Sequence, residues 1–254
     1  MRLFFISLLA AVMQLSASVH AAEYPTRTIK MIIPFAPGGG SDTLGCVLAE
    51  KMGNELGASV IVENKPGASS IIGTDAVAKA APDGYTLLLT NSAITSNPTF
   101  FKLPFDTQSL SAITKVANAP QLLVANPNAP FKNLKELLAY AKANPGKLNY
   151  ASQGNGSVSH IGTEIFKQTT GIDMVHVPYK GSGPAVQDVL AGQVQVFITT
   201  PPSVMQHVQS GKLKGLAVTG KNRHPGMPNV PTTAEAGLAS FQLESWVALY
   251  APAG

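Results

Sequence analysis

The sequence predicts an α/β fold of two lobes, each built on a mainly parallel sheet with crossover helices. Apolar runs of strand length alternate with helical patterns from residue 28 onward, as in repeated βα units. The pattern starts again near residue 121, and no low-complexity linker separates the halves. We therefore expect residues 23–120 to form a first lobe, residues 121–218 a second lobe, and residues 219–254 to return to the first. A ligand cleft is expected between the lobes.

Residues 1–22 have the pattern of a signal peptide. Arg2 provides the positive start, residues 3–15 are almost wholly apolar, and Ala21 or Ala22 offers a small-residue cleavage site. An apolar run of about thirteen residues is too short to span a bilayer, which needs ~20. We therefore expect export, with cleavage near Ala21 or Ala22.

Composition excludes several functional classes. The 254 residues, 45% of them hydrophobic, are enough for a substantial core. The formal net charge of +4 is dispersed, without the Lys and Arg runs that bind a phosphate backbone, so we expect no nucleic acid partner. A single cysteine, Cys46, excludes an intramolecular disulfide, and its apolar helical neighbourhood predicts a buried, inert thiol. The five histidines are isolated, so we expect no metal site and no cofactor.

The first half is expected to contain three strands, at residues 28–34, 60–62 and 85–90, and two helices, at residues 41–57 and 71–79. The first helix follows three glycines, and Ser41 or Asp42 can cap it before it ends at Gly57. Its apolar face comprises Leu44, Val47, Leu48, Met52 and Leu56.

The second half repeats the pattern. Strands are expected at residues 121–125, 148–151, 174–178, 194–199 and 214–218, helices at 134–143, 157–169, 183–191 and 204–209, and a late strand at 244–251. Asn133, with Glu136 three residues later, is a capping-box-like start for the helix at 134–143.

Three glycine-containing turns that run from a strand into a helix are the candidate binding elements. Glycine lets the backbone approach a ligand, and a helix N-terminus adds a positive partial charge, so such turns suit a carboxylate or phosphate. One turn in the first lobe and one in the second could bind the two ends of a small diacid. The three turns lie at residues 34–42, 152–157 and 179–184.

The sequence lacks the motifs of several other functional classes. Neither the P-loop pattern nor G-x-G-x-x-G occurs, so nucleotide binding has no specific support. The nucleophile-elbow pattern G-x-S-x-G is also absent. Ser157 and His160 leave an exported hydrolase open as an alternative, although Ser157 is more simply a helix N-cap.

The chain resembles the Bug family, the extracytoplasmic solute receptors of tripartite tricarboxylate transporters. One matching stretch is Val-Glu-Asn-Lys-Pro-Gly-Ala at residues 62–68, and another is His-Val-Pro-Tyr-Lys-Gly at 176–181. The resemblance covers essentially the whole mature chain. The further matches lie at residues 24–25, 34–39, 78–85, 211–213, 216–219, 230–232 and 234–237.

This resemblance implies a type II periplasmic binding protein fold, in which two α/β lobes close on a small, usually carboxylated solute. It implies no catalysis, a periplasmic location, a monomer, and a membrane permease as the partner, with a signalling protein as the alternative. It places the ligand contacts in four loops, namely Phe35, Ala36, Pro37, Gly38, Gly39, Gly40 and Ser41; Asn91 and Ser92; Ser152, Gln153, Gly154, Asn155, Gly156 and Ser157; and Tyr179, Lys180 and Gly181.

Two departures from the family pattern affect these expectations. Where the family commonly has Gly-Gln-Val-Asp and often a further Asp, this chain has Gln195 and Thr199, which we add to the candidate contacts. Neutral groups there favour a ligand without an ammonium group. The chain also stops at Gly254, where the family continues into helices that return to the first lobe, so that lobe is expected to lack part of its cover.

Overall fold

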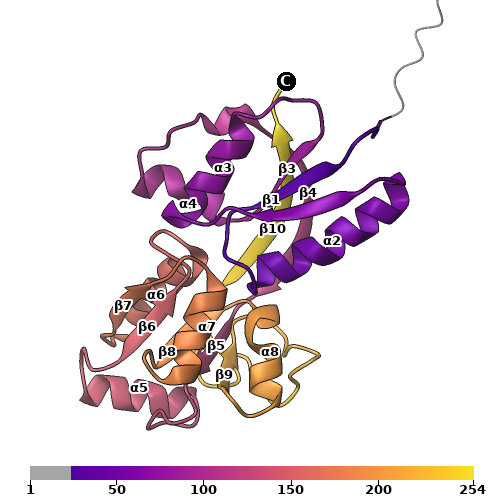
Figure 1. The fold of residues 1–254 in the computed structure, drawn as a ribbon. Coiled ribbons are helices and arrows are strands. Elements are labelled where there is room, and N and C mark those ends of the chain that lie inside the picture. The colour runs from indigo at the N-terminus through magenta and orange to yellow at the C-terminus, as the bar shows by residue number, and fades with distance from the viewer. Residues whose placement is uncertain (1–23) are drawn as a thin grey trace, which may run out of the picture.

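The computed structural model describes residues 24–254, so the expected signal peptide lies outside the described residues. Two α/β lobes lie one above the other in Figure 1, each with helices on both faces of its sheet. The first lobe contains strands β1 (Ile29–Ile33), β2 (Val60–Asn64), β3 (Thr86–Asn91), β4 (Leu110–Pro120) and β10 (Glu244–Pro252), with helices α2 (Gly40–Leu56), α3 (Ile71–Ala78) and α4 (Ala93–Phe100).

The second lobe has the same number of strands. It contains β5 (Leu122–Ala125), β6 (Asn149–Ser152), β7 (Val175–Pro178), β8 (Val196–Thr199) and β9 (Lys214–Val218), with helices α5 (Leu134–Ala143), α6 (Val158–Thr170), α7 (Ser182–Ala191) and α8 (Pro201–Gln209).

The sheets are mixed, whereas the sequence predicted mainly parallel ones. Their strand orders are β2-β1-β3-β10-β4 and β7-β6-β8-β5-β9. In each, the fourth strand of the order is antiparallel to both neighbours, so half of the strand pairings in residues 24–254 are antiparallel. The βα repeats predicted the parallel pairs. The apolar pattern of a strand such as β5 or β10 does not indicate whether it runs parallel or antiparallel to its neighbours.

Successive side chains along the strands of the first lobe point to opposite faces of the sheet and form two cores. Met31 and Ile33 on β1 face the core on the α2 side, whereas Ile32 joins the core with Val77 of α3 and Ile94 of α4. In the second lobe, α5 and α6 cover one face of the sheet, and α7 and α8 cover the other. Each face of both sheets therefore buries apolar side chains, which is the main stabilising contribution to such folds.

In the second lobe, the helix caps predicted from the sequence are present. The side chain of Asn133 accepts a hydrogen bond from the Glu136 N–H at 2.9 Å, which confirms the expected cap of α5. Ser157 caps α6 by accepting the His160 N–H. In the first lobe, by contrast, the N-cap of α2 is Gly39, which has no side-chain cap, and not Ser41 or Asp42.

Several expectations for individual segments are wrong. Cys46 is exposed on α2, not buried, and Val47 and Leu56 of the expected apolar face are 53% and 39% exposed. The helix α4 and the strand β4 were not predicted at all. Helix α4 has only eight residues and contains Pro98, and most residues along the first part of β4 are exposed, so neither segment has a recognisable apolar period.

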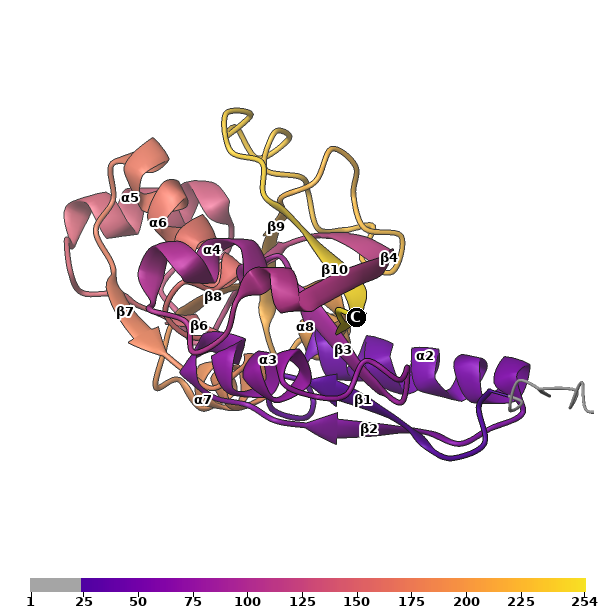
Figure 2. The same cartoon turned by 90° about the horizontal axis from the view of Figure 1, so that it is seen from above.

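The chain crosses between the lobes twice, at Gln121 and just before Glu244, and the crossings are bonded to each other. The Gln121 N–H donates to the Leu243 carbonyl at 3.3 Å and to Thr219 Oγ1 at 2.8 Å, and the Gln121 carbonyl accepts the Thr219 N–H. Residues 219–243 stay with the second lobe, where Phe241 packs on Phe166, so only β10 returns to the first. Figure 2 shows β10 beside β4 at this junction.

The edge of the first-lobe sheet at β4 is open to solvent. Ile113 of β4 is 52% exposed, and a shallow depression around it is also lined by Trp246 and Tyr250 of β10. Among the described helices, none is long and apolar enough to cross a membrane.

We predict that Gly73→Ala destabilises the first lobe. A Cβ at Gly73 would lie 2.7 Å from the Lys65 carbonyl oxygen and 2.8 Å from Pro34 Cβ, so α3 would be pushed from the β1 and β2 loops. We expect the unfolding free energy to fall by about 1–3 kcal/mol in urea denaturation. Ala76→Ser on the exposed face of α3 is the control, and equal stability of the two variants would contradict this packing.

Candidate ligand-binding site

Two cavities lie between the lobes. The hinge cavity, of about 220 Å³, lies against the crossing strands and the first turn of α2. The loop cavity, of about 210 Å³, lies among the loops that precede α3, α6 and α7. The hinge cavity is lined by Phe35, Gly39, Gly40, Ser41, Leu44, Asn91, Ala117, Asn118, Ala119, Pro120, Gln153, Ser182, Thr200, Pro201, Pro202, His224, Ser245 and Val247. The loop cavity is lined by Pro34, Phe35, Gly67, Ala68, Ser69, Ser70, Gln153, Gly154, Asn155, Pro178, Tyr179 and Lys180.

Phe35 and Gln153 line both cavities and form the wall between them. Both are buried, and Gln153 is fixed by two hydrogen bonds. Its Nε2 donates to Ser182 Oγ at 2.7 Å, and its N–H donates to Ser159 Oγ at 2.9 Å. One residue from each lobe therefore connects the two cavities.

The first-lobe turn is fixed by a carboxylate that faces away from the cavities. Asp42 accepts the Gly38 N–H at 2.9 Å and the Asn64 Nδ2 at 2.8 Å. Gly40 and Ser41, the first residues of α2, line the hinge cavity. Because no side chain caps this helix, its first N–H groups can donate toward that cavity. One of them, on Gly40, donates to Ser203 Oγ of the second lobe at 2.9 Å.

The loop before α3 is strained. Ala68, Ser69 and Ser70 all have positive φ, at 43°, 53° and 77°, which costs about 1–3 kcal/mol for each such non-glycine residue. Asn97 of α4 stabilises this shape, because its Nδ2 donates to the Ser69 carbonyl at 2.9 Å and to Ser70 Oγ at 3.1 Å. The loop places two hydroxyls and the N-terminus of α3 at the loop cavity.

The second-lobe turn is held by hydroxyl groups beneath it. Ser157 Oγ donates to the Gly154 carbonyl at 2.6 Å, and Ser152 Oγ accepts the Gly154 N–H at 3.1 Å. Ser152 and Ser157 are both buried and line neither cavity. They therefore shape the turn, while Gln153, Gly154 and Asn155 present it to the ligand space.

The electrostatics of the cavities favour an anion. No Asp or Glu lines either cavity, and Lys180 is the charged side chain at the loop cavity. Tyr179 Oη donates to Asp188 at 2.7 Å, and burial, with this carboxylate, raises the pKa of Tyr179 to about 12. Tyr179 lines the loop cavity, and its hydroxyl proton is already donated to Asp188. Within residues 24–254, no three His, Cys, Asp or Glu side chains gather in a way that could hold a metal ion.

Close backbone contacts join the lobes. The Ala36 N–H donates to the Lys180 carbonyl at 3.2 Å, and Ser96 Oγ donates to the Gly156 carbonyl at 2.9 Å. A Cβ on Gly183 would overlap the Pro37 carbonyl oxygen, and one on Gly181 would lie 3.1 Å from the Ala36 nitrogen. The lobes can therefore meet this closely only with glycine at those positions.

The ligand contacts predicted from the sequence divide into residues that line a cavity and residues that do not. Those that line a cavity are Phe35, Gly39, Gly40, Ser41, Asn91, Gln153, Gly154, Asn155, Tyr179 and Lys180. Ala36, Pro37 and Gly181 instead form contacts between the lobes, Gly38 is exposed, and Gly156 abuts Phe100 and Phe101. Ser92 bonds Ser245, and Thr199 is buried behind Ser182.

The assignment of Gln195 to the site requires correction. Gln195 directly precedes β8, so it lies at the end of that strand opposite the cleft. Its side chain accepts the Asn149 N–H at 3.0 Å and donates to the Gly192 carbonyl at 3.2 Å. It therefore ties the start of β6 to the end of α7 and lines neither cavity.

Ser157 and His160 do not form a nucleophile–base pair. Ser157 Oγ donates to the Gly154 carbonyl, and His160 Nδ1 accepts the Gly156 N–H at 3.1 Å. Ser152 Oγ lies 2.6 Å from His176 Nε2, but Ser152 is fully buried and no substrate could reach it.

Sequence reasoning missed two parts of the site. The loop of Gly67, Ala68, Ser69 and Ser70 follows a parallel strand and precedes a helix, so the rule that found the other turns could have found it. The hinge-side wall of Ala117, Asn118, Ala119 and Pro120 had no such signal, because it belongs to the unpredicted strand β4.

Comparison with known proteins assigns the family. The profile of the tripartite tricarboxylate transporter family receptor matches residues 45–254. The chain belongs to this family. The Bug protein BugT of Bordetella pertussis is 41% identical over 256 residues, which cover 98% of this chain and 78% of BugT.

Solved structures of similar proteins share the fold. The periplasmic binding protein BugD is 37% identical, with a TM-score of 0.86 over 91% of this chain and 78% of BugD. The R. palustris protein Rpa4515, solved with adipate, is 32% identical with a TM-score of 0.88 over 91% and 78% of the chains. MatC of Rhodopseudomonas palustris, solved with bound malate, is 33% identical with a TM-score of 0.84 over 91% and 80%. The two-lobe fold of this receptor is therefore that of periplasmic binding proteins.

We predict that Gly183→Ala keeps the lobes apart without weakening either one. Alanine is the better helix former in α7, but its Cβ would strike the Pro37 carbonyl across the cleft. In small-angle scattering the variant should have a larger radius of gyration than the wild type, with an unchanged or higher melting temperature. Gln187→Ala, exposed on the same helix, should scatter as the wild type does. An unchanged radius for Gly183→Ala would mean that the lobes do not meet at Pro37 in solution.

Proposed function

We propose that this protein is a periplasmic receptor that captures a small carboxylate between its lobes and delivers it to a tripartite tricarboxylate transporter permease. The observation that carries this proposal is the chemistry of the two cavities. Backbone N–H groups at the α2 and α3 termini, several hydroxyls and Lys180 surround them, and no carboxylate lines them. Such a lining stabilises an anion and offers no partner for an ammonium group.

The relatives support the same ligand class, because two proteins of this fold that are more than 30% identical were solved with adipate and malate. Both are small dicarboxylates. The hinge and loop cavities adjoin at Phe35 and Gln153, and each has polar lining groups, which supports a ligand with polar groups at both ends. Export would follow from the signal-peptide pattern of residues 1–22, with cleavage near Ala21 or Ala22 and a monomeric mature chain.

A signalling protein is the alternative partner, because closure of the lobes on a ligand would serve a sensor as well as a transporter. Co-purification with the detergent-solubilised permease, in the presence and absence of ligand, separates the two. Ligand-dependent capture of the permease supports transport, and capture of a sensor domain supports signalling.

The ligand class can be tested by a thermal-shift screen of the mature protein against mono-, di- and tricarboxylates. A ligand at 100 times its dissociation constant should add about 2.7 kcal/mol to the stability of the folded state. We predict that succinate binds more tightly than aspartate, because an ammonium group would lose its hydration without meeting a carboxylate. Tighter binding of aspartate, or no shift with any carboxylate, would contradict the proposal.

We also predict that Gly39→Asp weakens carboxylate binding by roughly 10- to 100-fold, from repulsion between two charges at ~6 Å. Gly39 has φ of −87°, and a Cβ there would make only an ordinary 3.5 Å contact with Ser182, so the backbone accepts a side chain. Gly39→Asn has the same shape without the charge and is the matched control in calorimetry. Equal affinities for the two variants would place the ligand charge away from the hinge cavity. Gly156 is unsuitable for the equivalent test, because its φ of 74° and its contacts with Phe100 and Phe101 would strain any side chain.

A further inference from the structure

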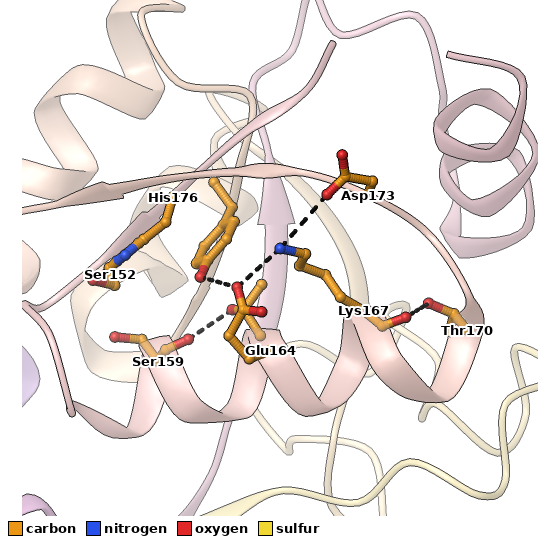
Figure 3. Close-up of polar contacts among 9 residues, drawn as sticks. Ser152, Ser159, Glu164, Lys167, Thr170, Asp173 and His176 are labelled. Carbon is orange, nitrogen blue, oxygen red and sulfur yellow. Dashed lines mark hydrogen bonds and ion pairs between the residues drawn. The ribbon is translucent and has the colours of Figure 1, made fainter. Parts of the chain in front are cut away.

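Three aromatic rings are stacked on the second lobe, behind the turn that faces the loop cavity. The His176 ring on β7 lies 4.9 Å from the Tyr150 ring and 4.2 Å from the His160 ring, with interplanar angles of 17° and 18°. Neither histidine lines the hinge or the loop cavity. Figure 3 shows His176 beside Ser152, with Glu164 and Lys167 extending from α6.

Each histidine of the stack holds one glycine of the ligand-facing turn. His176 Nε2 lies 2.6 Å from Ser152 Oγ, and Ser152 Oγ in turn accepts the Gly154 N–H at 3.1 Å. His160 Nδ1 directly accepts the Gly156 N–H at 3.1 Å. The stack therefore fixes both ends of the segment 154–156.

The same two glycines contact the first lobe. A Cβ on Gly154, which lines the loop cavity, would lie 3.0 Å from Ser69 Oγ. The Gly156 carbonyl accepts a hydrogen bond from Ser96 Oγ of α4 at 2.9 Å. A shift of this segment would therefore change the shape of the loop cavity and the contact between the lobes together.

The contact at Gly156 requires a neutral His160. A backbone N–H can only donate, so Nδ1 must keep its lone pair, and the proton of the neutral ring must lie on Nε2. Protonation at Nδ1 would place two donors against each other. The His176 ring centroid lies 4.2 Å from that of His160 across the stack. Positive charges on both rings would repel each other, so the two histidines resist being charged at the same time.

The charged groups around the stack come from α6 and the loop after it. Glu164 accepts a hydrogen bond from Tyr150 Oη at 2.5 Å and pairs with Lys167 at 3.0 Å, and Lys167 lies 3.8 Å from Asp173. Burial lowers the pKa of His160, which Glu164 opposes and Lys167 reinforces. Burial and the neighbouring His160 lower the pKa of His176 to about 4, again with opposition from Glu164 and reinforcement from Lys167. Phe100 of α4, the first-lobe ring next to His160, carries no charge.

We propose that His160 and His176 are positioning residues for the ligand-binding turn, and that His160 holds the Gly156 end only while its ring is neutral, so that acidification weakens ligand binding. This inference rests on the proposed receptor function. At neutral pH each ring carries a single proton and no charge, and the turn is fixed. As the pH falls through the pKa of His160, the bond to the Gly156 N–H is lost, and the affinity of the cleft falls with it.

Substitutions at His160 test the proposal with adipate and malate as probes in calorimetry from pH 7.5 down to pH 4. His160→Asn retains an acceptor near the Nδ1 position but does not titrate, so it should bind within a few-fold of the wild type at pH 7.5. His160→Phe keeps the ring but removes the acceptor, and should bind roughly tenfold more weakly at pH 7.5, the size expected for one lost hydrogen bond. His207→Gln, on the distant last turn of α8, is the histidine control and should follow the wild type throughout.

The wild-type affinity should fall more steeply at acid pH than that of His160→Asn, measured with the same ligand so that protonation of the ligand itself cancels. Identical pH profiles for the wild type and His160→Asn would overturn the proposal. Wild-type affinity of His160→Phe at pH 7.5 would overturn it as well.

A measurement without ligand separates this inference from the proposed function. In ¹⁵N spectra of the wild type, the Gly156 amide signal should move with a midpoint below pH 6.5, together with the His160 ring signal. In His160→Asn the movement of Gly156 should disappear, while that of Gly154, which depends on His176 through Ser152, should remain. If no carboxylate binds but these shifts occur, the proposed function fails and the positioning role stands. If carboxylates bind and Gly156 titrates equally in His160→Asn, the positioning role fails alone.

Discussion

The two strand crossings, at Gln121 and at Leu243, are hydrogen-bonded to each other, and the rest of the molecule depends on this constraint. Gln121 is buried, and its backbone bonds Thr219 on one side and the Leu243 carbonyl on the other. Two ordered crossings leave the lobes little freedom except to open and close about this junction. The carboxyl ends of β1 and β3 consequently face those of β6 and β8, which is where the glycine-rich turns lie. Every contact in the cleft follows from that arrangement.

Within the cleft, close approach of backbones replaces the usual packing of side chains. Gly40, Gly154, Gly181 and Gly183 each stand where a Cβ would press on the other lobe. Small residues there bring N–H groups and helix termini to the ligand space, where they favour negative charge. The strained loop 68–70 also serves the site, because Asn97 holds a conformation in which Ser69 and Ser70 line the loop cavity. The ligand-facing turns thus depend on residues that never touch the ligand.

The sequence was most informative where local rules apply and least where an element has no apolar pattern. The βα repeats, the cap at Asn133 and the candidate turns at Phe35, Gln153 and Tyr179 followed from period, capping chemistry and glycine placement. Strand β4 and helix α4 were missed because an exposed strand and a short helix that contains proline have no periodic signal. Cys46 was misplaced because an apolar neighbourhood in sequence does not establish which side of a helix faces the core. Gln195 was misplaced because the alignment of a motif says nothing about which end of a strand meets the cleft.

By itself, the sequence determined the two-lobe α/β class, the family and the three turns suited to an anion, since these depend on residue types at short spacing. The tertiary structure decided which turns meet, because contacts such as Ala36 with Lys180 join residues far apart in the chain. It also decided the direction of β5 and β10, which pair antiparallel with neighbours distant in sequence. The stacking of His160 on His176 was decided in the same way, since the two rings come from different elements and meet only when α6 packs on the sheet. Short sequence patterns do not determine contacts between distant residues. Those contacts are stabilised by the burial of apolar surface from all the elements of a lobe together.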